Sequence, residues 1–116
     1  MTVTIYHNPR CSKSRQTLQL LQEKGVEPEQ VLYLEQPPSA KELQGLLGKL
    51  GISARELLRT GEEAYKSLSL SDKSLADDVL IKAMCEHPKL IQRPIVVNGE
   101  RAVLGRPPEN VLDLLA

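Results

Sequence analysis

The spacing of hydrophobic and polar positions changes several times along the chain, and the first change falls within its first 25 residues. Residues 2–6 are rich in β-branched side chains, which is typical of a strand. Over residues 12–24 the apolar side chains lie on one side at helical spacing, and Gly25 is a typical helix end. The apolar run 31–34 predicts a buried second strand. Together these segments predict a right-handed βαβ unit with parallel strands.

Helical spacing dominates the middle of the chain. After two prolines, Ser39 and Glu42 have the spacing of a capping box, and four leucines follow at i, i+3, i+4 and i+7. Ser53 and Glu56 repeat this signal, which predicts another short helix, followed by short helical turns and loop. A further apolar face predicts a helix over residues 72–86.

The last part of the chain predicts a β-hairpin and a helix. Residues 95–97 and 101–104 are strand-like and flank Asn98-Gly99, a pair that favours a turn with positive φ at both positions. A final helix is expected over 109–115. The order of elements is that of an α/β, thioredoxin/glutaredoxin-like mixed sheet of about four strands, with a helical insertion after the second strand.

Length and charge narrow the classes of function. The chain has 116 residues, which fits a single domain over residues 1–116. Fifteen basic residues balance fifteen acidic ones, so no charged tail would attract nucleic acid or a membrane surface. Two cysteines are too few for a disulfide framework and fit a reducing compartment. No apolar run reaches the length of a membrane span, and no leader pattern opens the chain. We therefore expect a cytoplasmic protein without nucleic-acid or membrane partners.

The segment His7-Asn8-Pro9-Arg10-Cys11-Ser12-Lys13-Ser14-Arg15 carries the candidate chemistry. Its cysteine lies between the first predicted strand and the first predicted helix. The positive end of the helix dipole favours a thiolate there, and free N–H groups of the first turn can bind an oxyanion. The alternative is a small buried apolar side chain, a common role for cysteine. No Cys/His cluster has metal-ligand spacing, so we expect no metal.

Four segments of the chain together resemble the glutaredoxin-linked arsenate reductases of the ArsC family. They are the segment 7–15, Glu56-Leu57-Leu58-Arg59, Arg93-Pro94-Ile95 and Gly105-Arg106-Pro107, and the likeness extends over about residues 4–112. The resemblance implies an enzyme with one catalytic thiol and no bound cofactor. Its cysteine attacks arsenate, glutathione as co-substrate releases arsenite, and a glutaredoxin reduces the mixed disulfide. We expect it to act as a monomer.

The resemblance also implies roles for individual residues. It makes Cys11 the nucleophile and assigns binding of the oxyanion to three arginines, Arg59, Arg93 and Arg106. It has His7 and Ser14 tune the thiolate, and Pro94 is a structural residue near the site. Guanidinium groups suit these roles because they stay charged and donate in a planar fork that fits tetrahedral oxyanions. Proline peptide bonds adopt cis at low cost, and we expect the Arg93–Pro94 bond to be cis beside the cysteine.

Each of these residues also has a simpler interpretation. An arginine can be a solvated surface charge, and Pro94 can be an ordinary trans proline at the start of a strand. His7 can be a strand-end histidine satisfied by the backbone. Ser14 can be a plain first-turn residue, or its hydroxyl can donate to the thiolate.

Two alternatives to arsenate reduction are open at this point. The first is a monothiol reductase of another oxyanion or of a glutathione mixed disulfide. The second is a thioredoxin-fold transcription regulator, but such regulators carry Cys-x-x-Cys, and this chain has Ser14 at the second position. Without that second thiol an external one is needed to resolve a mixed disulfide. Cys85, near the end of a predicted helix, is expected to serve in packing.

Overall fold

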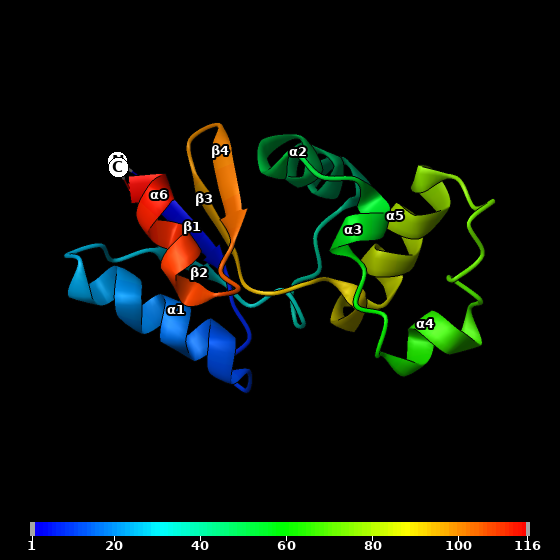
Figure 1. Ribbon diagram of the computed structural model, residues 1–116, viewed down its shortest axis with the longest axis horizontal. Helices are drawn as coiled ribbons and strands as arrows, with labels where there is room; N and C mark the ends of the chain where they lie inside the picture. The colour runs from blue at the N-terminus through cyan, green and yellow to red at the C-terminus, as the bar shows by residue number, and fades with distance from the viewer. Residues whose placement is uncertain (1, 116) are drawn as a thin grey trace. The chain divides into compact units, whose positions relative to one another are not determined.

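The computed structural model describes residues 2–115, which form two compact units along the chain. One unit, here called the sheet unit, comprises residues 2–36 and 93–115. The other, the helical unit, comprises residues 37–92 and is inserted in the chain between the second and third strands (Figure 1). An inserted run of helices after the second strand is what the sequence predicts.

The sheet unit contains a four-stranded mixed sheet with helices packed on it (Figure 1). Its elements are β1 (Val3–Tyr6), α1 (Ser12–Glu23), β2 (Glu29–Val31), β3 (Ile95–Asn98), β4 (Arg101–Leu104), a 3-10 turn η2 (Pro108–Asn110) and α6 (Val111–Leu115). The strand order is β2-β1-β3-β4, in which β1 and β2 are parallel and the other pairs are antiparallel. This is the predicted sheet.

The core of the sheet unit lies between strands and helices. Val3, Ile5 and Val96 of the central strands are at most 3% exposed and pack against Leu21 of α1 and Leu114 of α6. Burying an aliphatic side chain of this size contributes about 1.5–3 kcal/mol relative to exposure. These contacts fix α1, and therefore its N-terminus, against the sheet.

The second strand lies two residues earlier than the sequence predicts. Strand β2 spans 29–31, and the expected strand 31–34 is wrong beyond its first residue. The Leu32 carbonyl accepts hydrogen bonds from the N–H groups of Glu35 (2.9 Å) and Gln36 (2.8 Å), which turns the chain. Among the described strands β2 pairs with β1 alone, and as an edge strand it tolerates the exposed Glu29 and Gln30, which precede the apolar run.

The hairpin is present, but its turn is displaced by one residue. Asn98 ends β3 and pairs with Arg101, so the turn is Gly99-Glu100. Only Gly99 of these has positive φ, 63°, which contradicts the expectation of positive φ at Asn98. The Asn98 side chain instead donates to the Leu114 carbonyl at 3.0 Å and is thereby held to α6. That helix starts at residue 111 rather than 109, because the 3-10 turn η2 precedes it.

The helical unit consists of four α-helices and a 3-10 turn. They are α2 (Ala40–Leu50), α3 (Ala54–Leu57), α4 (Glu63–Ser67), α5 (Asp77–Glu86) and η1 (Pro88–Leu90). Ser39 caps α2 by accepting the Glu42 N–H at 3.1 Å, and Ser53 and Glu56 form a complete capping box at α3. Both helix starts agree with the prediction. None of the helices in the described part of the chain is long and apolar enough to cross a membrane.

Helix α5 begins five residues after its predicted start at residue 72. The Asp72 carboxylate accepts hydrogen bonds from the Ser74 N–H (2.9 Å) and hydroxyl (2.6 Å), which closes a local turn. The Arg55 guanidinium donates to the carbonyls of Leu70 (2.9 Å) and Asp72 (2.8 Å). These bonds hold the segment as a loop, and the helix starts only at Asp77.

Candidate active site

The Cys11 side chain lies at the N-terminus of α1, as its place in the sequence predicts. Strand β1 ends at Tyr6, and a short loop leads to Cys11, which is the N-cap residue of the helix. The loop is closed by a hydrogen bond from the Cys11 N–H to the Asn8 carbonyl (3.0 Å), and the Asn8 side chain accepts the Arg10 N–H (3.0 Å). The thiol is partly exposed and not bonded to another cysteine.

The surroundings of Cys11 favour its thiolate. Burial acts to raise the pKa of the thiol, but four interactions outweigh it and leave the pKa lowered. They are a hydrogen bond from the Ser14 N–H, a side-chain hydrogen bond from Arg93, the positive charge of Arg93 and a hydrogen bond from the Lys13 N–H. Backbone donors of a first helical turn and a cation are what a nucleophilic cysteine requires.

His7 and Ser14 form a buried pair beneath the loop. The His7 Nδ1 atom is 2.6 Å from the Ser14 Oγ atom, and Ser14 Oγ also accepts the Asn8 N–H at 3.0 Å. Burial and the charge of Arg15 lower the pKa of His7, so the imidazole is neutral near pH 7. The hydroxyl of Ser14 thus bonds to His7 and Asn8, while its backbone N–H is the donor to the Cys11 sulfur. One of the two interpretations of Ser14 from the sequence had its hydroxyl as the donor to the thiolate.

Arg93 reaches the thiol from the start of β3. Tyr6 at the end of β1 pairs with Ile95, so the antiparallel pairing brings residues 93–94 beside the loop that carries Cys11. The Arg93–Pro94 peptide bond is cis, as predicted, and Pro94 is buried. Arg93 is half-buried and hydrogen-bonds Cys11.

Gly105, directly after β4, contacts both the cis proline and helix α1. Its N–H donates to the Pro94 carbonyl (2.9 Å), and its own carbonyl accepts from Thr17 Oγ1 (3.1 Å), which also donates to the Lys13 carbonyl (2.8 Å). A Cβ at this glycine would lie 2.6 Å from Thr17 Oγ1 and 2.8 Å from Pro94 Cγ. Helix α1, the cis proline and the strand end before Arg106 are therefore held together by these contacts.

Arg106 follows this locked glycine and is exposed. Its bond to Pro107 is also cis, which the sequence analysis did not predict. The Arg106 carbonyl accepts a hydrogen bond from the Asn110 side chain at 3.3 Å, and the same side chain donates to the Leu104 carbonyl at 3.0 Å. The backbone on both sides of Arg106 is therefore fixed while its guanidinium extends into solvent.

Arg59 belongs to the helical unit, where its backbone is well anchored. Its N–H donates to the Leu90 carbonyl at 2.8 Å, next to a β-bridge between Leu58 and Ile91. Its Nε atom is 3.6 Å from Glu62 Oε2, an ion pair whose side chains are about one-quarter exposed. A partly exposed ion pair of this kind is worth less than about 1 kcal/mol.

Cys85, the second cysteine, has the opposite electrostatic environment. Burial raises the pKa of its thiol, and the charges of Glu42 and Glu86 raise it further. No basic group contributes to that pKa. Within residues 2–115, moreover, no three His, Cys, Asp or Glu side chains gather in a way that could hold a metal ion.

Two residues of the site were missed from the sequence. Thr17 lies on the apolar side of the helix expected over residues 12–24, where the sequence predicts no polar role for it, yet it is fully buried and its hydroxyl bonds to a residue 88 positions away. Asn8 was part of the motif without a role, yet it accepts and donates hydrogen bonds that close the loop. A polar residue in the middle of an apolar helix face was the one available signal for Thr17.

A four-stranded mixed sheet, with a cysteine at the start of its first helix and a cis proline before its third strand, defines a thioredoxin-like protein. Within that class, the ArsC family model matches residues 6–114, and the chain belongs to this family.

Individual relatives agree with this assignment over nearly their full length. The uncharacterized protein YfgD of Escherichia coli K12 is 60% identical over 97% of this chain and 96% of its own. The arsenate reductase of Haemophilus influenzae is 53% identical over 99% and 100% of the two chains. The solved structure of an arsenate reductase from Vibrio cholerae matches with a TM-score of 0.95 and 54% identity, over 97% of each chain.

Proposed function

We propose that the protein is an arsenate reductase that uses Cys11 as its single nucleophile and takes electrons from glutathione and a glutaredoxin. The observation that carries this proposal is the Cys11 thiol, whose pKa is lowered by backbone donors and by Arg93 at a helix N-terminus. Hydrogen-bond donors and a positive charge around this thiolate offset its repulsion of an approaching oxyanion. Relatives of about half identical sequence are named arsenate reductases, which supports the choice of oxyanion.

The first step forms a bond between sulfur and arsenic. The Cys11 thiolate attacks the arsenic of HAsO₄²⁻, and one oxygen leaves as water after it takes up two protons. The product is a thioester-like adduct, Cys11–S–AsO₃H⁻, in which arsenic is still pentavalent. In this proposal Arg93, which hydrogen-bonds the thiol, also donates to the arsenate oxygens, and Arg106 supplies further charge. The resemblance to the family assigns the same role to Arg59. His7 and Ser14 hold the loop from below and keep the Ser14 N–H aimed at the sulfur.

The second step moves two electrons to arsenic. Glutathione forms a disulfide with the Cys11 sulfur, the sulfur–arsenic bond breaks, and its electron pair stays with arsenic. Arsenite, H₂AsO₃⁻, leaves with the thiol proton, and Cys11 carries a glutathione mixed disulfide. A glutaredoxin thiolate then attacks the glutathione sulfur and releases Cys11 as a thiolate. The external thiols are needed because Ser14 stands where a Cys-x-x-Cys motif has its second cysteine, and the other cysteine, Cys85, has a raised pKa.

A reconstituted assay tests this proposal. The purified protein with arsenate, glutathione and glutaredoxin should produce arsenite, and Cys11→Ser should abolish turnover because a hydroxyl is a far poorer nucleophile near neutral pH. Without glutaredoxin, intact-mass analysis should find one glutathione adduct of about 305 Da, located on Cys11 by peptide mapping. Cys85→Ser is the matched control and should keep most of the activity.

Two outcomes would contradict the proposal in different ways. A Cys11–Cys85 disulfide, together with an inactive Cys85→Ser variant, would indicate an internal resolving thiol and a different reductase class. Reduction of glutathione mixed disulfides without any reduction of arsenate would instead favour a monothiol reductase of another substrate.

A further inference from the structure

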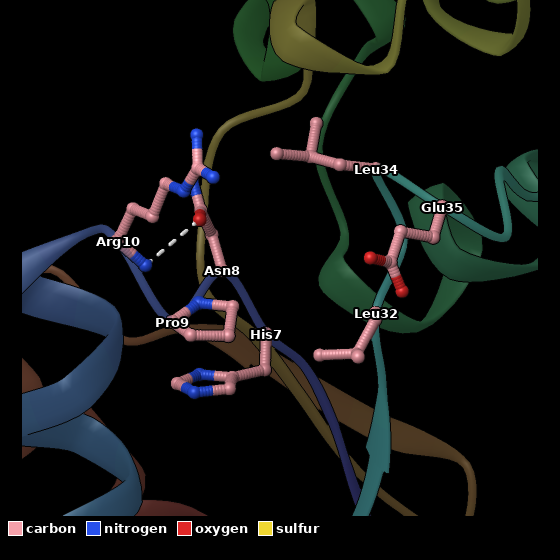
Figure 2. A pocket seen from close by; sticks show the side chains of 7 residues that line it. All are labelled: His7, Asn8, Pro9, Arg10, Leu32, Leu34 and Glu35. Atoms are coloured by element: carbon pink, nitrogen blue, oxygen red, sulfur yellow. Dashed lines mark hydrogen bonds between the residues drawn. The ribbon is translucent and has the colours of Figure 1, made fainter.

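A cavity of about 300 Å³ lies beside the loop that carries Cys11. It is lined by two segments of the sheet unit, which are His7, Asn8, Pro9 and Arg10 on one side and Leu32, Leu34 and Glu35 on the other (Figure 2). These segments directly follow β1 and β2, which are parallel neighbours, so the cavity opens at the carboxyl ends of the strands. In open α/β sheets this is where ligands bind, and the volume is at the lower end of the range for small-molecule sites.

The walls of the cavity combine opposite charges with an apolar surface. Figure 2 shows Arg10 on one wall and the Glu35 carboxylate on the other, turned toward the space between them. Within residues 2–115 neither the Arg10 guanidinium nor the Glu35 carboxylate takes part in a hydrogen bond or an ion pair. Leu32 and Leu34 supply the apolar surface. A short ligand that carries both an ammonium and a carboxylate group would satisfy both charges at once.

The cavity is lined by the residue that precedes Cys11, although Cys11 itself does not line it. Arg10 precedes Cys11 directly, so their Cα atoms are about 3.8 Å apart. A tripeptide extends over roughly 10 Å, which is enough to fill the cavity and still bring a thiol to the Cys11 sulfur.

We propose that this cavity binds glutathione, with its γ-glutamyl ammonium group facing Glu35 and a carboxylate facing Arg10. The inference rests on the proposed function, in which glutathione is the thiol that resolves the Cys11 adduct, and it adds where that thiol binds. Recognition by two charges would make Cys11 discriminate between glutathione and small uncharged thiols of similar reactivity.

Thiol exchange without arsenate tests the cavity by itself. In a Cys85→Ser background, the Cys11 thiolate attacks glutathione disulfide to form Cys11–S–S–glutathione and releases a glutathione thiolate. The same reaction with hydroxyethyl disulfide, which is uncharged, gives the reference rate. Intact-mass analysis over time gives both rates, and alkylation by iodoacetamide reports the intrinsic reactivity of the thiolate in each variant.

Arg10→Gln and Glu35→Gln should each lower the ratio of the glutathione rate to the hydroxyethyl rate by about threefold to tenfold, since each removes a charged partner. Leu34→Trp should lower it further by filling the cavity. Hydroxyethyl exchange and alkylation should stay within about twofold in all three, which also shows that the variants are folded. Glu23→Gln and Lys24→Gln, which make the same changes of charge at the far end of α1, are the controls and should leave the ratio unchanged.

An unchanged ratio in both Arg10→Gln and Glu35→Gln would overturn the inference, and so would an equal loss with both disulfides. The experiment also separates this inference from the proposed function. If the protein does not reduce arsenate but the variants lower the ratio as expected, the glutathione cavity is supported and arsenate as substrate is contradicted. If the protein reduces arsenate and the variants leave the ratio unchanged, arsenate as substrate is supported and the glutathione cavity is contradicted.

Discussion

The two cysteines differ in the sign of the interactions around them. Donors and a cation lower the pKa of Cys11, whereas burial and two carboxylates raise the pKa of Cys85. At about pH 6 Cys11 should carry a much larger thiolate fraction than Cys85, so a limiting alkylating reagent should label Cys11 far faster. Peptide mass mapping after a short reaction measures this. Equal labelling of the two thiols would mean that the helix N-terminus does not activate Cys11.

Arg93 should control both the acidity of the thiol and the binding of the oxyanion. Arg93→Ala removes a hydrogen bond and a charge that lower the pKa of Cys11, so the pH midpoint of Cys11 alkylation should rise toward that of an ordinary thiol. Arsenate reduction should fall by about 10²–10³ in kcat/KM, as when one preorganised donor is lost. In Arg93→Lys the pH midpoint of Cys11 alkylation should be closer to the wild-type value than the kcat/KM is, because lysine keeps the charge but not the planar fork.

The exposed Arg101 offers a control for this experiment. Its guanidinium donates to the Asp113 carbonyl at 2.9 Å, at the hairpin end of β4. Arg101→Ala should leave the alkylation midpoint and kcat/KM unchanged. Full activity in Arg93→Ala would remove Arg93 from the site.

At the residue scale, the sequence predicted the groups that have a local signal. Cys11 was found from its position between a strand and a helix, and the cis bond after Arg93 from a proline before a strand. The Ser14 hydroxyl and Thr17 could not be placed in the same way. The Ser14 hydroxyl bonds to His7 and Asn8, which depends on how the loop before α1 folds back on the helix. The Thr17 hydroxyl bonds to Gly105, which is 88 positions away in the sequence.

At the scale of elements, Gly105 determines how closely β4 and α1 approach each other. An added Cβ would overlap Thr17 and Pro94, so Gly105→Ala should cost about 1–3 kcal/mol in the free energy of unfolding, the usual range for overpacking. Because the displaced groups adjoin Arg93 and Arg106, the KM for arsenate should rise as well. Denaturant unfolding and steady-state kinetics measure the two effects.

Gly48 provides the matched substitution in an open position. It lies within α2, and a Cβ built there meets nothing within 4 Å. Gly48→Ala should therefore stabilise the protein by about 0.5–1 kcal/mol through helix propensity, with no change in KM. If both alanine variants changed stability by the same amount in the same direction, the close contact at Gly105 would not be the cause.

The elements themselves were predicted well where patterns are long and less well at their boundaries. Helix α2 has a cap, a leucine stripe and a terminal glycine, and all three are in place. The apolar run at 31–34 could not reveal that its first residue ends an edge strand. The start at residue 72 was wrong because an aspartate that resembles a helix cap closes a turn with Ser74 instead.

At the scale of the whole molecule, we expect the chain to be a single domain, in which the sheet unit and the helical unit unfold together. Gly105→Ala, in the sheet unit, should then lower the denaturant midpoint at which the partly exposed Cys85, in the helical unit, becomes fully accessible to a thiol reagent. The shift should match that seen by circular dichroism. An unchanged Cys85 midpoint would instead show that residues 37–92 unfold as an independent domain.

The position of the reactive loop in the sheet has a consequence for local opening. Tyr6 pairs with Val31 on one side and with Ile95 on the other, so the loop that carries Cys11 leaves from an interior strand. Interior strands usually exchange their amide hydrogens only when the whole domain opens. The amides of β1 and β3 should therefore exchange most slowly, and those around the Gly99 turn much faster. The nucleophile would then be anchored on the part of the sheet that opens last.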